Sequence, residues 1–462
     1  MYPQTIATMP SIDNQTPICY ALRLQFYFQT THEEPPQAVG RANEAAMTDF
    51  EYKNGILHAE EVSVEALVAE HGTPLYIYSK SHLRNQYLGL ANAMQAVKPL
   101  ICFSMKANSN GAVIKTLLDE GSGLDIVSGG ELYRALRVGA DPKKIVFAGV
   151  GKTHDEIEYA LKSNILFFTV ESEAEARRIS ECAVRTGTTG RIAFRINPNV
   201  DPKTHRYIST GKEENKFGLN IDRTLKAYAM AAELPGIEIA GLHMHIGSQI
   251  LTPDPFHGAL NKIAGFCSEL KSLYPTLTHL DIGGGLGIKY EPDETPLDPT
   301  VYAAKIVDQL KQIDLQVVME PGRNLAGNCG ILVSRVQYVK DNPLKTFIVI
   351  DAGMSDLLRP ALYQAYHEIQ PVREGSGTVH GDLVGPICES GDFLAADRDL
   401  PLMDEGDLVA VRSAGAYGFT MASTYNSRPL PAEVLVEGQR SWLIRERETW
   451  DHLIASERLP DA

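Results

Sequence analysis

The chain has 462 residues, of which 44% are hydrophobic and 22% charged, a composition typical of a globular protein long enough for two domains. Its formal net charge of −15 excludes a nucleic-acid-binding surface and gives no support to one that binds anionic membranes. No apolar stretch approaches the roughly 18 residues that span a bilayer, so we expect no membrane contact. The six cysteines are scattered without CxxC pairs, which indicates free thiols in a reducing, cytoplasmic setting rather than disulfides or a zinc site.

The first 46 residues differ in character from the rest of the chain. They mix Gln, Thr and Pro with one apolar patch, Ile18 to Phe28, which is interrupted by polar residues. A secretory signal has a cleaner apolar centre, and a transit peptide avoids an acidic pair such as Glu33-Glu34. We therefore expect residues 1–46 to form a disordered extension, with Met47 as the working initiator.

From residue 74 onward, strand-like apolar runs alternate with segments of helical periodicity. The predicted strands are Leu100–Met105, Leu124–Val127, Ile145–Ala148, Leu166–Val170, Arg191–Ile196, Ala240–Ile246, Leu277–Ile282 and Gln316–Met319. The predicted helices include Glu131–Val138, Glu173–Ala183, Thr224–Ala232, Ala259–Leu273 and Val301–Gln312. This α/β alternation predicts a parallel (β/α)8 barrel, a TIM barrel, at residues 81–325, with a doubly wound sheet as the alternative.

After about residue 325 the pattern changes to short β-rich runs separated by Gly, Pro and Asp turns. These runs are Gly330–Lys340, Thr346–Ile350, Leu408–Arg412, Glu433–Glu437 and Gln439–Arg445. Few long helical stretches lie between them, so we predict a mostly antiparallel β-barrel or sandwich domain at residues 326–462. Residues 47–80 should add an N-terminal strand to it, taken from residues 52–64.

Active sites of such barrels lie at the carboxyl ends of the strands. Those ends carry Lys106, Asp125 with Ser128, Gly149, Glu171, Asn197, His245, Gly283-Gly284-Gly285 and Glu320. The lone amine of Lys106, with its stem in apolar surroundings, is suited to hold a carbonyl cofactor as a Schiff base. We expect desolvation to lower the pKa of this lysine and make it nucleophilic.

Four further motifs each allow two interpretations of their function. Gly283–Gly287 is either a phosphate-binding loop or a plain turn. Glu320 either holds a pyridinium proton or forms a salt bridge with a barrel cation. His243 and His245 lie on one side of a strand. They either form a metal-binding pair like that of amidohydrolases, or His243 is a core residue and His245 stacks on a cofactor ring. Cys388-Glu389 supplies an acid and an amine-binding carboxylate, or contains a buried structural cysteine.

In this order, the motifs around Lys106 (Ser-Met-Lys-Ala-Asn), His245 (His-Ile-Gly-Ser), the triple glycine, Glu320 (Glu-Pro-Gly-Arg) and Cys388 (Cys-Glu-Ser-Gly-Asp) resemble the diaminopimelate decarboxylase family. These are pyridoxal-phosphate enzymes of fold type III, the alanine-racemase-like group. The resemblance runs from about Met47 to the C-terminus. It implies decarboxylation of meso-2,6-diaminopimelate to L-lysine and CO2, the last step of lysine biosynthesis. It also implies a homodimer whose active site is shared across the interface.

The resemblance also implies a role for each matching residue. Catalysis would use Lys106 as the Schiff-base lysine, His245 as the ring-stacking residue and Cys388 as the proton donor. The pyridoxal 5′-phosphate would be bound by Lys106, His245, Ser248, Gly284, Gly285, Glu320, Pro321, Gly322, Arg323 and Tyr417. The substrate would be bound by Arg323, Arg359, Tyr363, Glu389 and Tyr417. Cys388 and Glu389 would come from the partner subunit, and His205 to Gly218 would form the family's mobile loop.

Several alternatives remain open at this stage. The chain could be a related decarboxylase of ornithine, arginine, lysine or carboxynorspermidine. These substrates lack a second α-amino-acid head, however, and Glu389, Arg359 and Tyr363 favour a substrate that has one. A racemase needs a second acid/base residue opposite Lys106, and a non-catalytic cofactor carrier is a single barrel without a β domain. A metal-dependent hydrolase would bind zinc and show no visible absorption.

Overall fold

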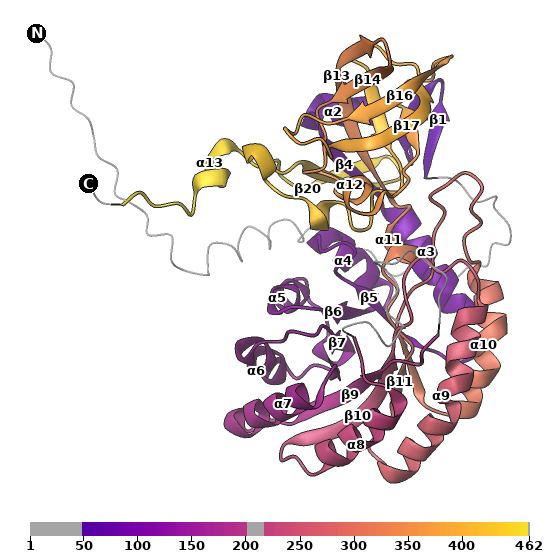
Figure 1. The fold of residues 1–462 in the computed structure, drawn as a ribbon, viewed down its shortest axis with the longest axis vertical. Coiled ribbons are helices and arrows are strands. Elements are labelled where there is room, and N and C mark those ends of the chain that lie inside the picture. The colour runs from indigo at the N-terminus through magenta and orange to yellow at the C-terminus, as the bar shows by residue number, and fades with distance from the viewer. Residues whose placement is uncertain (1–48, 201–216, 461–462) are drawn as a thin grey trace, which may run out of the picture. The chain divides into compact units, whose positions relative to one another are not determined.

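The computed structural model describes residues 49–200 and 217–460 (Figure 1). The expectations for residues 1–46 and for most of the loop after His205 lie outside the described residues.

Eight parallel strands close into a barrel in the order β10-β11-β12-β5-β6-β7-β8-β9. Their bounds are β5 (Leu100–Ser104), β6 (Gly123–Ile126), β7 (Ile145–Phe147), β8 (Phe167–Val170), β9 (Gly190–Ile196), β10 (Ile237–Met244), β11 (His279–Asp281) and β12 (Gln316–Met319). Val318 of β12 pairs with Leu100 of β5, which closes the ring. Closure confirms the predicted barrel and excludes the doubly wound sheet.

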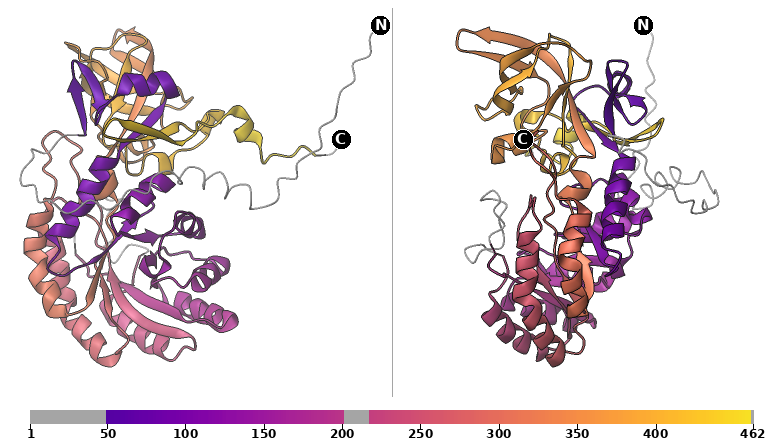
Figure 2. Two further views of the ribbon diagram at one scale, coloured as in Figure 1. Left: turned by 180° about the vertical axis from the view of Figure 1, so that it is seen from behind. Right: turned by 90° about the vertical axis from the view of Figure 1, so that its right-hand side faces the viewer.

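Helices follow the barrel strands and surround them on the outside (Figure 2). They are α4 (Gly111–Asp119), α5 (Gly129–Arg137), α6 (His154–Ser163), α7 (Glu173–Thr186), α8 (Ile221–Ala232), α9 (Asp254–Leu273), α10 (Pro299–Ile313) and α11 (Arg323–Ala326), with α3 (Lys80–Ala93) before β5. Side-chain caps set several starts: Ser128 accepts the Glu131 N–H at α5, and Ser172 accepts the Glu175 N–H at α7. These caps fix where the two helices begin after β6 and β8.

The C-terminal part is a nine-stranded, mostly antiparallel sheet. Its strands are β13 (Gly330–Asn342), β14 (Lys345–Ile350), β15 (Ile369–Pro371), β16 (Thr378–Val384), β17 (Phe393–Pro401), β18 (Leu408–Val411), β19 (Ala432–Glu437) and β20 (Arg440–Arg445), together with β4 (Leu75–Ser79). The short helix α12 (Arg359–Tyr363) connects β14 to β15, and α13 (Trp450–Ile454) follows the last strand. Sequence analysis predicted five of these strands and missed β15, β16 and β17.

The strand from the N-terminal region is not the one expected. The segment that we assigned, residues 52–64, lies largely in a separate small sheet of β1 (Phe50–Lys53), β2 (Ile56–Ala59) and β3 (Val62–Ser63), followed by α2 (Val64–His71). The strand that enters the large sheet is β4, which pairs antiparallel with β13 and parallel with β19. All five residues of β4 are buried, so it lacks the alternating pattern that draws attention to a strand.

A buried carboxylate joins the β strands to the barrel. Glu433 of β19 is fully buried and accepts hydrogen bonds from Tyr78 Oη at 2.7 Å and Asn110 Nδ2 at 2.9 Å, and it pairs with Arg445. Asn110 in turn caps α4, the helix after the first barrel strand. This link fixes the β sheet against the mouth of the barrel.

Two expectations from composition have structural counterparts. None of the helices in the described ranges is long and apolar enough to cross a membrane. Cys102, Cys182, Cys267, Cys329 and Cys388 are all free thiols in the structure.

Candidate active site

Lys106 lies just beyond β5, at the mouth of the barrel. Its Nζ is 2.9 Å from Asp125 Oδ2 on β6, and Ser104 Oγ donates to the same oxygen. Burial opposes a charge on this amine, but Asp125, Tyr417 and Glu320 outweigh it and raise the pKa of Lys106 above its ordinary value. The expected lowering of the pKa is therefore wrong, because Asp125 contacts the amine and Glu320 lies near it.

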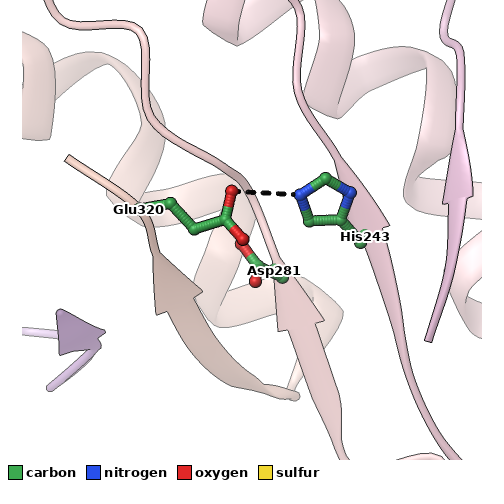
Figure 3. Close-up of side chains that lie close together, drawn as sticks. All are labelled: His243, Asp281 and Glu320. Carbon is green, nitrogen blue, oxygen red and sulfur yellow. Dashed lines mark hydrogen bonds and ion pairs between the residues drawn. The ribbon is translucent and has the colours of Figure 1, made fainter. Parts of the chain in front are cut away.

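Glu320, at the end of β12, forms a buried cluster with His243 of β10 and Asp281 of β11 (Figure 3). His243 Nε2 is 3.2 Å from Glu320 Oε2, and Asp281 Oδ1 accepts the Gly283 N–H at 2.8 Å. Burial alone would raise the pKa of Glu320, but His243 and then Lys106 lower it below its ordinary value. Burial and the charge of Glu320 raise the pKa of Asp281. These opposite shifts favour the ionised form of Glu320 and the neutral form of Asp281.

This cluster corrects one step of the sequence analysis. His243 is buried, as expected of a core residue, but it is paired with a carboxylate rather than isolated. The salt-bridge partner of Glu320 is this imidazole, not a barrel lysine or arginine. One ligand atom from each of His243, Asp281 and Glu320 lies within 4.8 Å of the others. The ends of β11 and β12 therefore supply two acids next to this histidine, as a metal site would require.

His245 lies just past β10 and is a neutral imidazole. Its Nδ1 accepts the Gly284 N–H at 3.2 Å, and burial together with Arg195 lowers its pKa well below the ordinary value. Arg195 itself pairs with Glu171 at 3.2 Å, and Glu171 also accepts the Gly218 N–H at 2.7 Å. A neutral, flat ring is suited to stack on an aromatic cofactor.

The glycines of the loops after β11 and β12 are required by close backbone packing. A Cβ on Gly284 would lie 2.1 Å from the Glu320 carbonyl oxygen, and one on Gly285 would lie 2.4 Å from the Gly247 carbonyl oxygen. A Cβ on Gly322 would crowd Ser104 at 3.1 Å and the Tyr417 hydroxyl at 3.3 Å. Pro321 completes the packing, because its carbonyl accepts the Ser104 N–H at 3.0 Å. These loops form a cradle of backbone beside Lys106.

Arg323 and Arg359 add two buried cations at this mouth, each with 6% of its surface exposed. Arg323 donates to Ser248 Oγ at 3.1 and 3.3 Å and stacks 4.8 Å from the centre of the Tyr417 ring. The guanidinium of Arg359 lies 6.0 Å from the centre of the Tyr363 ring. Four predicted substrate-binding residues, the two arginines and the two tyrosines, are therefore brought together.

Tyr417 contacts both Arg323 and the segment that carries Lys106. Its backbone N–H donates to the Ala107 carbonyl at 2.8 Å, directly after Lys106. Its φ of 57° lies in the left-handed region, which is strained for a tyrosine and occurs mostly at functional positions.

Cys388 and Glu389 lie in the loop between β16 and β17, and both are exposed. The loop is ordered by Asp392, which accepts the Met354 and Ile387 N–H groups, and by Asn426, which accepts the Cys388 N–H at 2.7 Å. Within the described residues, no hydrogen bond or ion pair links either side chain to Lys106. The reading of Cys388 as a buried structural cysteine is wrong.

Sequence analysis did not identify two residues that contact Arg323 and Arg359. Tyr290 accepts a hydrogen bond from Arg323 Nη1 at 2.7 Å, and His367 Nε2 lies 3.4 Å from Arg359 Nε. The available signal was proximity: Tyr290 follows the glycine loop by three residues, and His367 follows Tyr363 by four.

The donor set fits pyridoxal phosphate. Lys106 offers an amine for an aldehyde, the glycine cradle lets a phosphate approach the backbone closely, and the Glu320 carboxylate suits a ring nitrogen that carries a proton. Asp125 Oδ1 is buried without a hydrogen-bond partner among the described residues, as expected where a cofactor supplies one.

Comparisons with known proteins identify the family to which this chain belongs. Residues 80–327 match the family described as pyridoxal-dependent decarboxylase, pyridoxal binding domain. The chain is 47% identical to diaminopimelate decarboxylase of Pseudomonas aeruginosa, over 89% of this chain and 99% of that protein. The crystal structure of diaminopimelate decarboxylase from Helicobacter pylori complexed with L-lysine is similar, with 42% identity, a TM-score of 0.82 and coverage of 85% of this chain and 98% of that one. A lysine/ornithine decarboxylase from Vibrio vulnificus, at 23% identity and a TM-score of 0.72, shares the fold.

Proposed function

The chain belongs to the diaminopimelate decarboxylase family, and from this we infer that it converts meso-2,6-diaminopimelate to L-lysine and CO2. It is a carboxy-lyase of lysine biosynthesis that uses pyridoxal 5′-phosphate. The observation that carries this substrate assignment is the pair of buried guanidiniums, Arg323 and Arg359, of which Arg323 stacks on Tyr417, whose backbone N–H bonds the residue after Lys106. Two such cations suit a substrate that keeps a second carboxylate after the first is lost.

Side chains from four parts of the barrel would hold the cofactor. Lys106 supplies the amine for its aldehyde, and neutral His245 supplies a flat face for its ring. The close backbone approach at Gly284 and Gly285, with Ser248, suits its phosphate. Glu320 would keep the ring nitrogen protonated. When bound, pyridoxal phosphate supplies the electron sink that makes loss of CO2 feasible.

The remaining residues bind the substrate and move one proton. Arg323, Arg359 and Tyr363 would orient the distal carboxylate, and Glu389 would receive the distal ammonium. As the bond from the α-carbon to its carboxylate breaks, the electron pair stays behind and CO2 departs. The Cys388 thiol would then give its proton to the α-carbon and regain one from solvent, with Lys106 as the alternative donor.

We propose that the working unit is a cytoplasmic homodimer, in which Cys388 and Glu389 reach the site of a second copy. Two observations support this proposal: both residues are exposed, and neither pairs with Lys106 within the described part of the chain. The five free cysteines suit a reducing compartment. We further propose residues 81–325 and 326–462 as the functional domains, with 47–80 belonging to the second.

CO2 release from meso-diaminopimelate, ornithine and lysine tests the activity. We expect release from meso-diaminopimelate and a visible absorption band of the bound cofactor, both lost in Lys106→Ala. Release from ornithine instead would favour the related decarboxylases. A protein that stays colourless when pyridoxal phosphate is supplied and leaves meso-diaminopimelate intact would overturn the assignment.

Mixing two inactive variants tests the shared site. Lys106→Ala and Cys388→Ala chains, denatured and refolded together, should regain about a quarter of wild-type activity, because half the dimers are mixed and each has one intact site. No recovery, with mixed dimers demonstrated by differential tagging, would contradict the exchange of Cys388.

A further inference from the structure

Within the part of the chain that the structure describes, the two buried guanidiniums have no acidic partner. Among residues 49–200 and 217–460, neither Arg323 nor Arg359 forms a salt bridge with a carboxylate. Burying a cation without an anion is costly, and two close together are costlier. The molecule must therefore hold these two charges in place by other means until an anion arrives.

Tyr290 interacts with both arginines. Its hydroxyl accepts a hydrogen bond from Arg323 Nη1 at 2.7 Å, and the centre of its ring lies 4.8 Å from the Arg359 guanidinium and 5.7 Å from that of Arg323. The negative face of an aromatic ring attracts such cations. One buried side chain thus sets the spacing of the two guanidiniums.

His367 fixes Arg359 from the other side. Its Nδ1 donates to the Arg412 carbonyl at 2.8 Å, which leaves Nε2 as an acceptor facing Arg359 Nε at 3.4 Å. Burial, with the charge of Arg359, lowers the pKa of His367 to about 3, so the imidazole is neutral at physiological pH. The ring also meets Tyr290 edge-on, with centres 5.4 Å apart.

This arrangement leaves donors of Arg359 available for a ligand. Its Nε is engaged by His367, whereas its terminal nitrogens have no hydrogen-bond partner among the described residues. A planar carboxylate matches the geometry of such terminal N–H groups. A protonated histidine here would add a third cation and lose the acceptor, and the neutral ring avoids both.

We propose that Tyr290 and His367 are positioning residues that hold Arg323 and Arg359 in the geometry that binds the substrate's distal carboxylate. They thereby help to select a substrate with a second amino-acid head. This inference rests on the proposed function, and it extends the substrate pocket beyond Arg323, Arg359 and Tyr363.

Kinetics of the holoenzyme variants Tyr290→Phe and His367→Phe test the proposal. Each change deletes a partner of a guanidinium and keeps the ring, so KM for meso-diaminopimelate should rise about tenfold or more, while kcat changes less than about threefold. The dissociation constant of the product L-lysine, measured by calorimetry, should rise by the same factor because lysine retains the distal head. The visible spectrum and the cofactor affinity should not change.

Conservative and surface variants provide the controls. His367→Gln keeps both a donor and an acceptor and should recover most of the substrate affinity that His367→Phe loses. The exposed Tyr338 and His380 offer matched controls, and Tyr338→Phe and His380→Phe should behave as wild type.

The outcomes separate this proposal from the proposed function. If the wild type releases CO2 from meso-diaminopimelate, but Tyr290→Phe and His367→Phe both keep KM and lysine affinity within twofold, the positioning role is wrong. A loss of kcat with unchanged KM would also refute it. If the wild type releases no CO2, the proposed function itself fails. Should His367→Phe fold poorly, Tyr290→Phe still decides the matter, since it removes a single hydroxyl group.

Discussion

Replacing His243 by leucine tests the buried cluster at the ends of β10, β11 and β12. The change removes the hydrogen-bond partner 3.2 Å from Glu320 Oε2 and fills similar volume. A hydrogen bond to a charged group contributes about 1.5–3 kcal/mol, and here no water replaces it because both residues are buried. Without the imidazole, less positive charge offsets the repulsion between Glu320 and the carboxylates of Asp281 and Asp125. The pKa of Glu320 should therefore rise, and its negative charge should decrease.

Since about 1.4 kcal/mol corresponds to a tenfold change in rate, we expect kcat for CO2 release to fall about 10- to 100-fold in His243→Leu. The control is His380→Leu. His380 also contacts carboxylates, Asp397 at 3.2 Å and Asp399 at 3.0 Å, but on the surface. Its replacement should leave kcat unchanged within error.

The stability of the cofactor-free protein supplies a second measurement. The lowered pKa of Glu320 means that its ionised form stabilises the fold above the ordinary carboxyl pKa of 4.5, and that this stabilisation fades as the pH falls below it. The difference in unfolding free energy between wild type and His243→Leu should therefore be largest near pH 7 and shrink below pH 4.5. A kcat within twofold of wild type, with a stability difference independent of pH, would refute the reasoning.

Three further variants probe neighbouring features. Asp125→Asn removes the anion that raises the pKa of Lys106, so the rate of cofactor reconstitution should reach its plateau at lower pH than in wild type; a profile unshifted in pH would contradict this. Lys152→Met leaves the buried Glu175 carboxylate, 2.7 Å from Lys152 Nζ, without its cation. It should lower the free energy of unfolding, measured with denaturant, by about 3 kcal/mol. The control Lys162→Met, at an exposed ion pair, should lower it by less than about 0.5 kcal/mol. Gly284→Ala places a Cβ 2.1 Å from the Glu320 carbonyl oxygen, so cofactor affinity measured by titration should drop at least tenfold; unchanged affinity would show that the cradle tolerates a side chain.

Much of the fold could be predicted from local patterns. The strand Gln316–Met319 has the predicted bounds, and α7 and α10 differ from prediction by three residues or fewer at each end. Apolar periodicity reports which face of a segment is buried, so the alternation of strands and helices identifies a parallel barrel. Because strand ends of such a barrel converge, Lys106, His245 and Glu320 could be placed at one mouth before any coordinates.

Tertiary structure decided what depends on distance between remote segments. His243, Asp281 and Glu320 lie on three different strands, and only the stagger of the barrel brings their side chains into contact. The same holds for β4, whose buried residues show no alternation, and for Tyr290 and His367, which lie in irregular loops. The raised pKa of Lys106 likewise depends on a carboxylate from the next strand. Local sequence determines which face is apolar, whereas charge, hydrogen bonding and pKa depend on neighbours that the register of the barrel supplies.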